Sequence, residues 1–103
     1  MIAPAFELTG PGRFRVRGTL DFTSVGRLEQ AARPLLRAAP EAVVDLSGVE
    51  SANSAALALL LEWVDQARQS RRRVRFAGVP AAVLEIARVS NVAELLPLAE
   101  TGD

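Results

Sequence analysis

Residues 42–63 constrain the fold more than any other part of this chain. They begin with a short run, residues 42–46, that is apolar except for Asp45, and a serine–glycine pair follows it. A segment rich in alanine and leucine then starts at Ser54. This order predicts a buried strand, a tight loop and a helix, with Ser54 near the N-terminus of the helix.

The rest of the chain alternates between strand and helix patterns. The other predicted elements are, in chain order, an edge strand over residues 5–9, a strand over 13–20, a helix that starts at Thr23 or Ser24, a strand over 74–77, a helix with Pro80 in its first turn that ends at 90–91, and a short apolar element over 95–98. Pro34 lies inside the first helical pattern, where it removes one backbone hydrogen bond. We expect it to kink that helix or to end its regular part near Arg33.

Strands that alternate with helices predict an α/β fold with a mainly parallel sheet and right-handed crossovers. We expect four or five strands, with the helices packed mainly on one side. Residues 42–46 should lie in the interior of the sheet, because strands that are buried on both faces read as nearly continuous apolar runs. A length of 103 residues suits a single domain, residues 1–103.

The composition removes the residue types that most chemistry requires. The chain has no cysteine and no histidine, and therefore neither a thiol nor the commonest general base and metal ligand. It shows no phosphate-binding glycine loop, and no two carboxylates have a convincing spacing for acid–base work. We therefore expect no catalytic residue, no cofactor and no metal site, and we do not expect an enzyme.

Charge and hydropathy bear on partners and location. The formal net charge is zero, so no global field attracts nucleic acid or an acidic membrane. Residues 1–4 show no charged leader before an apolar core, which argues against a signal peptide. The longest apolar run, residues 55–61, is far shorter than the ~20 residues that span a bilayer. We expect a cytoplasmic protein with no nucleic-acid partner and no direct membrane insertion.

Two sets of charged residues lie in predicted strands. Arg13, Arg15 and Arg17 alternate with apolar residues, so one face of their strand is basic. That row is either a solvated strand face or a contact surface for anions. Asp45 is the single acid of its strand, and we expect it to accept hydrogen bonds from N–H groups of the loop that follows.

The helix from Ser54 to about residue 70 has an apolar face and a neighbouring shoulder. On a helical wheel the main buried face contains Leu57, Leu60, Leu61 and Val64. Leu59 and Trp63 lie on the shoulder with Ala56. Either they complete the core, as apolar residues at helical spacing usually do, or Trp63 is an exposed anchor for a partner.

Ser54 itself has three possible roles. Serine is a preferred helix cap, and a hydroxyl at the positive end of a helix dipole can also contact a partner or accept a phosphate. The residue types alone do not choose among these roles.

Two motifs resemble the signature of the STAS domain family, which is named for sulfate transporters and anti-sigma factor antagonists. They are Val-Asp-Leu-Ser-Gly-Val at residues 44–49 and Asn-Ser-Ala-Ala-Leu at residues 53–57. The strand over residues 14–20 and the Gly78–Val79 turn also fit, so the resemblance covers nearly the whole chain. It implies a STAS-type fold.

The resemblance also implies site residues and partners. Ser54 matches the serine or threonine that is phosphorylated in anti-sigma factor antagonists, but Asn53 stands where those proteins usually have Asp, and Ala56 where they usually have Gly. The alanine- and leucine-rich helix is more similar to the MlaB subgroup, a small subunit of a phospholipid-transporting ABC complex that maintains outer-membrane lipid asymmetry. That likeness implies a non-catalytic subunit that is peripheral to the inner membrane and binds the ATPase subunit. The implied contact residues are Asn53, Ser54, Ala55, Leu59 and Trp63.

The alternative that the resemblance implies is an anti-sigma factor antagonist. Phosphorylation of Ser54 would then switch its binding to a kinase-like anti-sigma factor. The departure at Asn53 favours the transporter subunit.

Overall fold

The computed structural model describes residues 3–99. Its elements are β1 (Ala5–Gly10), β2 (Arg13–Leu20), α1 (Val25–Arg37), β3 (Glu41–Ala52), α2 (Ser54–Gln69), β4 (Arg73–Ala77), α3 (Ala81–Val89) and a short 3-10 helix, η1 (Ala93–Leu95). The predicted order of strands and helices is therefore confirmed.

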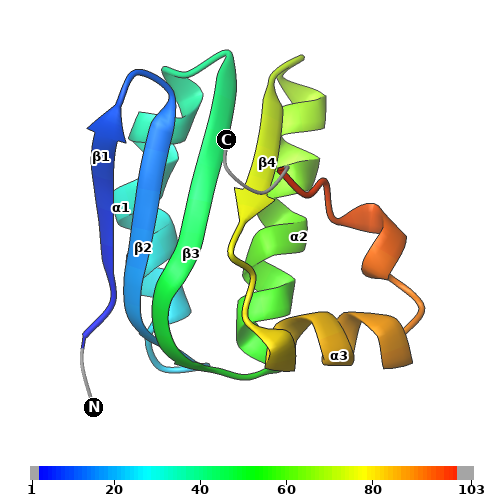
Figure 1. Cartoon of the computed structure of the whole chain (residues 1–103). Coiled ribbons are helices and arrows are strands. Elements are labelled where there is room, and N and C mark those ends of the chain that lie inside the picture. The colour runs from blue at the N-terminus through cyan, green and yellow to red at the C-terminus, as the bar shows by residue number, and fades with distance from the viewer. Residues whose placement is uncertain (1–2, 100–103) are drawn as a thin grey trace.

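The four strands form one sheet in the order β1-β2-β3-β4 (Figure 1). Strand β1 runs antiparallel to β2, while the β2–β3 and β3–β4 pairs are parallel. The sheet is thus mixed and mainly parallel, as expected. Strand β3 lies in its interior, and the side chains of Ala42, Val44 and Leu46 are buried. The apolar run over residues 42–46 predicted this position.

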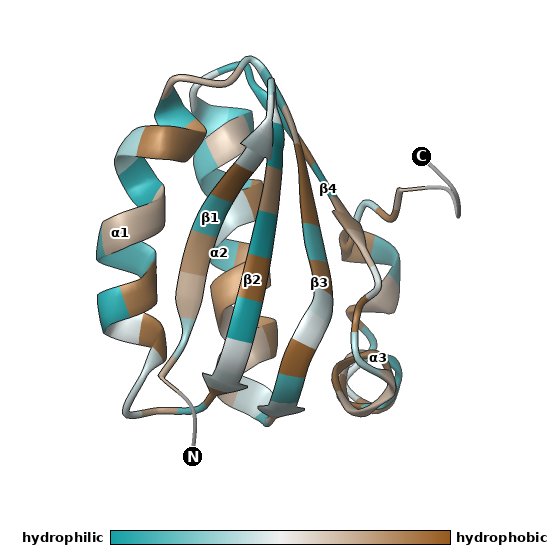
Figure 2. Ribbon diagram, turned by 60° about the vertical axis from the view of Figure 1, so that its left-hand side comes forward, coloured by the Kyte–Doolittle hydropathy of each residue, from teal (hydrophilic) through white to brown (hydrophobic). Residues whose placement is uncertain are grey.

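Helices α1 and α2 cover one face of the sheet (Figure 1). No helix of residues 3–99 covers the other face, which we call the open face. Helix α3 follows β4 and packs against α2. Hydrophilic and hydrophobic residues alternate along β2, and their side chains point to opposite faces of the sheet. The alternation is visible as successive teal and brown bands on this strand (Figure 2). The core lies between the sheet and the helices, and its largest fully buried side chains are Trp63, Phe76, Leu20, Leu46, Leu60, Val16, Val44 and Val83.

Strand β3 is longer than its apolar run. It continues through Ser47 and Gly48, where a tight loop was expected, and ends at Ala52. The pairing with β2 shifts register on either side of Gly48, which is the mark of a β-bulge. A Cβ at Gly48 would lie 2.9 Å from the Cγ atom of Arg17, so there is little space for a side chain at this position.

Pro34 does not end α1, which continues to Arg37. Of the two expected effects of Pro34, an end of the regular helix near Arg33 is therefore wrong, and a kink stays a prediction. Pro34 lies in the last turns of the helix and is exposed, so its ring points away from the core.

The middle of α2 is buried over a wider arc than the wheel suggested. Leu59 and Trp63 are only 6% and 2% exposed, whereas Val64, from the expected main face, is half-buried. The ring of Trp63 meets that of Phe6 on β1 edge-on, with centroids 5.6 Å apart. Phe6 also stacks on Phe14. Long-range contacts thus place Trp63 in the core, and its interpretation as an exposed anchor is wrong for the free domain.

Candidate functional site

The first turn of α2 is capped by Asn53, not by Ser54. The backbone of Asn53 is extended, with φ −126° and ψ −161°, and its side-chain oxygen accepts a hydrogen bond from the N–H of Ala55 at 2.8 Å. Its own N–H donates to the carbonyl of Leu20 at 3.2 Å, which ties the start of the helix to the end of β2. The plain capping role that was one possibility for Ser54 is therefore filled by its neighbour.

Ser54 is the first residue of α2 and is exposed. Within the described part of the chain its hydroxyl has no hydrogen-bond partner, and the first turn of the helix contains no acidic residue. N–H groups at a helix start lack intrahelical partners, and the dipole there is positive. The hydroxyl therefore stands in solvent, at a position that favours a negatively charged or hydrogen-bond-accepting group.

An apolar hollow of about 260 Å³ lies beside this turn, between the starts of α1 and α2. We call it the Phe22 hollow, and it is lined by Phe22, Val25, Gly26, Glu29, Ala55, Ala58 and Leu59. Phe22 is 74% exposed, the largest exposure among the large apolar side chains of residues 3–99. An aromatic ring exposed beside an apolar hollow is typical of a protein-binding surface.

The loop between β2 and α1 is held in shape by its own polar groups. One oxygen of Asp21 accepts hydrogen bonds from the N–H of Thr23 at 2.9 Å and from its hydroxyl at 2.7 Å. Ser24 donates its hydroxyl to the carbonyl of Thr19 at 2.9 Å and accepts from the N–H of Asp21. These bonds fix the loop on both sides of Phe22, so its ring is presented outward on a defined backbone.

The same hydrogen bonds affect the acidity of Asp21. The hydroxyl of Thr23 first, and its N–H second, stabilise the carboxylate and lower the pKa of Asp21 below its usual value of 3.8. Asp21 therefore stays ionised at neutral pH, and the loop keeps its hydrogen bonds.

The predicted contact residues separate into a surface group and a buried group. Asn53 and Ser54 are exposed at the start of α2. Ala55 and Leu59 are buried and line the floor of the Phe22 hollow. Trp63 is fully covered and lies outside that hollow, so it supports the site only through the packing of α2.

Phe22 is the residue that the sequence analysis missed. Its signal was present, because an aromatic residue stands between Asp21 and Thr23, two residue types that favour turns and helix starts. Neither periodicity nor a motif marks such a residue as exposed, and the hollow beside it forms only when two helix starts meet.

Asp45 has the structural role that the sequence suggested. Its Oδ1 atom accepts a hydrogen bond from the N–H of Ser47 at 2.9 Å. Gly78, with a φ of +61°, approaches the same oxygen so closely that a Cβ would lie 3.1 Å from it. Asp45 therefore stabilises the bulged part of β3, and the space around it requires a small residue at Gly78.

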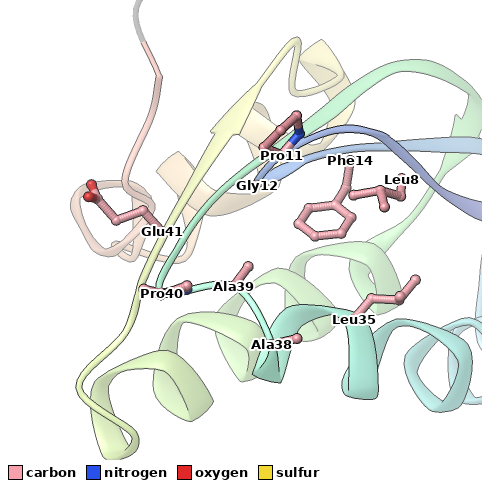
Figure 3. A pocket seen from close by; sticks show the side chains of 9 residues that line it. All are labelled: Leu8, Pro11, Gly12, Phe14, Leu35, Ala38, Ala39, Pro40 and Glu41. Carbon is pink, nitrogen blue, oxygen red and sulfur yellow. The ribbon is translucent and has the colours of Figure 1, made fainter.

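Other features of residues 3–99 add no chemistry to this site. They contain no group of three or more acidic residues placed to hold a metal ion, and no helix among them is long and apolar enough to cross a membrane. A second hollow, at the opposite end of the sheet, is lined by Leu8, Phe14 and Leu35 together with glycine, alanine, proline and Glu41, the first residue of β3 (Figure 3). It carries no cluster of polar groups that would fix a small ligand.

A mixed four-stranded sheet with two helices on one face is the fold of a STAS-type domain. The chain belongs to the family described as Mlab, STAS domain, whose model matches residues 7–97. This confirms the resemblance drawn from the motifs at residues 44–49 and 53–57.

Solved structures share the fold. A crystal structure of an anti-sigma factor antagonist from Mycobacterium paratuberculosis matches with a TM-score of 0.77 at 23% identity, covering 98% of this chain and 87% of that one. The unphosphorylated form of the anti-sigma factor antagonist SpoIIAA matches with a TM-score of 0.71 at 14% identity, covering 96% and 90%. The phosphorylated form of SpoIIAA, described as a Bacillus cell fate determinant, gives 0.69 at 14% identity, covering 96% and 93%. No curated protein sequence matches this chain at a significant level.

Proposed function

We propose that this domain is a non-catalytic subunit that binds the cytoplasmic ATPase of an ABC transporter for phospholipids, supporting its assembly and regulation. The protein would then lie at the cytoplasmic side of the inner membrane, attached through the transporter complex. Membership of the family described as Mlab supports the transporter role. The proposed contact surface consists of Asn53, Ser54, Phe22 and the floor of the Phe22 hollow at Ala55 and Leu59.

The observation that carries this proposal is the exposed hydroxyl of Ser54. A serine that caps a helix needs no other function, but here Asn53 makes the capping hydrogen bond. Ser54 lies instead beside an exposed aromatic side chain and an apolar hollow. Such an arrangement combines an apolar anchor with a polar group at the rim, which is the usual composition of a protein interface.

Replacing Ser54 by Glu tests the proposal. Glutamate suits the positive end of a helix dipole, so the isolated domain should keep its fold. In an interface, however, the long charged side chain must lose its water without gaining a partner, and binding should weaken by about 2–5 kcal/mol. We expect Ser54→Glu to lose the ATPase subunit when the two are co-expressed and purified through a tag on this domain.

A matched control is Ala82→Glu, which places the same charge in the exposed first turn of α3. It should co-purify with the ATPase subunit at normal stoichiometry. Ser54→Arg should also lose the partner, with a slightly less stable fold because of the dipole. A Ser54→Glu variant that keeps full stoichiometry and supports full lipid transport would contradict the proposal.

A second candidate is an anti-sigma factor antagonist, which the likeness in fold to SpoIIAA supports. In that role Ser54 would be phosphorylated, and the added charge would act as a switch. The two candidates differ in their gene neighbours, which would be either permease and substrate-binding genes or a kinase and a sigma factor. Mass spectrometry of the native protein would detect phosphate on Ser54 in the second case only.

A further inference from the structure

The open face of the sheet is basic. Because side chains alternate along each strand, five arginines point away from the helices: Arg13, Arg15 and Arg17 on β2, and Arg73 and Arg75 on β4. We call these five residues the basic face. They belong to the side of the sheet that lies opposite α1 and α2, and that side faces the reader in Figure 1. They are five of the twelve arginines in a chain whose net charge is zero, so the charge is unevenly distributed.

Most of these arginines lack an ionic partner within the described residues. Only Arg17 forms an ion pair, at 2.9 Å from Glu7. Arg33 and Arg88, on the helices, are each paired with a glutamate of their own helix. The unpaired guanidinium groups of the basic face are therefore available to an external anion, which they can bind through two parallel hydrogen bonds.

The strand register arranges two of these groups around one point. Val43 on β3 is the neighbour of Arg13 on one side and of Arg75 on the other. Neighbouring strands lie about 4.8 Å apart, so the two arginines flank Val43 at a backbone separation of about 10 Å. A hollow of about 170 Å³ lies on the β2 side of Val43. Its lining consists of Thr9, Arg13, Phe14, Arg15, Val43, Asp45 and Ala77, so it contains two arginines and one acid, and Arg75 lies outside it.

We propose that the basic face binds an acidic segment of a partner protein, with one carboxylate placed over Val43 between Arg13 and Arg75. The surface lies away from Ser54, because Arg13 begins β2 whereas Asn53 is bonded to Leu20 at the other end of that strand. The proposal is independent of the partner assigned to Ser54.

A protein segment fits this face better than a nucleic acid does. Sheets that bind single strands stack bases on aromatic rings, and no aromatic side chain lies on this face. Phe14, Phe76 and Trp63 are buried, Phe6 packs against two of them, and Phe22 belongs to the hollow beside α2.

Carboxylates on the same face also select against a continuous polyanion. Glu7 and Asp45 both neighbour Arg15 in the register, and Glu41 neighbours Arg73. They would repel a nucleic acid backbone or an anionic membrane surface that covered the whole face. A protein segment can place its acids over Val43 and leave these positions free.

The test uses Arg13→Gln/Arg75→Gln and a fluorescent peptide of alternating glutamate and threonine. The matched control is Arg27→Gln/Arg68→Gln, which removes the same charge from exposed helix positions that have no ion pair within residues 3–99. Binding is measured by anisotropy at low salt, and the contact is mapped by amide chemical shifts. A thymidine oligonucleotide and vesicles containing phosphatidylglycerol serve as the other two probes.

We expect the peptide to shift the amides around Val43, Arg13 and Arg75. The Arg13→Gln/Arg75→Gln variant should bind it about tenfold more weakly, and the control within about twofold of the wild type. Equal weakening in both variants, or shifts confined to other surfaces, would overturn the proposal. Tighter binding of the oligonucleotide or the vesicles than of the peptide would overturn it as well.

Discussion

Helix α2 differs sharply between its middle and its first turn. In the middle, Leu59 and Trp63 are buried by the sheet and by Phe6 of β1. In the first turn, Ser54 is exposed and Asn53 alone makes the side-chain bond that starts the helix. Side chains in the middle determine whether the helix can pack at all. Side chains in the first turn can change while the packing stays, which leaves them available for binding.

Truncation of Trp63 tests the first half of this comparison and should have the largest effect. Trp63→Ala should lower the free energy of unfolding by ~3–5 kcal/mol, because it removes a large buried side chain and leaves a cavity. Chemical denaturation of the isolated domain measures this loss. Trp63→Phe should cost less than the alanine variant, since it keeps a ring against Phe6 and removes an indole N–H that has no partner. A fully stable Trp63→Ala variant would mean that the middle of α2 does not depend on this contact.

Asn53 should show an intermediate effect. Asn53→Ala removes the hydrogen bond to the N–H of Ala55 and should cost ~0.5–2 kcal/mol of stability. Asn53→Asp keeps the acceptor and adds a charge that suits the helix start, so it should restore or exceed the stability of the wild type. The same denaturation curves separate the two variants. Equal stability of Asn53→Ala and the wild type would show that the cap lies elsewhere.

Ser54 should contribute little to the fold. Ser54→Ala removes a hydroxyl that makes no bond within the described residues, and alanine is the better helix former. We expect its stability to stay within about 0.5 kcal/mol of the wild type. A loss as large as that of Asn53→Ala would return Ser54 to a structural role and remove the contrast between the two neighbours.

Asp21 should show the smallest effect, and a pH-dependent one. Its pKa is lowered in the folded state by Thr23, so its charge stabilises the fold above its usual pKa of 3.8. That contribution is lost as the pH falls through the lowered pKa. Asp21→Asn keeps an oxygen acceptor but cannot titrate, so the small difference in stability from the wild type should vanish at acidic pH. A difference that stays constant from neutral to acidic pH would contradict this account.

The strand patterns predicted the sheet well because the relevant signals are local. Alternation in residues 13–17 and the apolar run over residues 42–46 each reflect which faces of a strand are covered. The length of β3 could not be predicted in this way. Gly48 looks like a turn residue, and only the register shifts in the pairing of β3 with β2 show that it lies in a bulge.

The candidate site was predicted in part. The motif around Asn53 and Ser54 located the right helix start, but both residue types are good caps, and the backbone geometry decides between them. The helical wheel placed Trp63 on a shoulder of α2 because a wheel contains only the residues of one helix. It cannot show the contact with Phe6, which is distant in sequence and adjacent in space. Phe22 was not predicted because its exposure depends on two helix starts that meet.

The position of Trp63 has a consequence for optical measurements. It is the only tryptophan, and the chain has no tyrosine, so the intrinsic fluorescence of the domain comes almost entirely from one side chain. That indole lies in an apolar setting and meets the ring of Phe6, which belongs to the edge strand of the sheet. Its emission should therefore be blue-shifted in the folded protein and move to longer wavelength when β1 detaches. A single unlabelled sample thus reports whether the edge strand is in place.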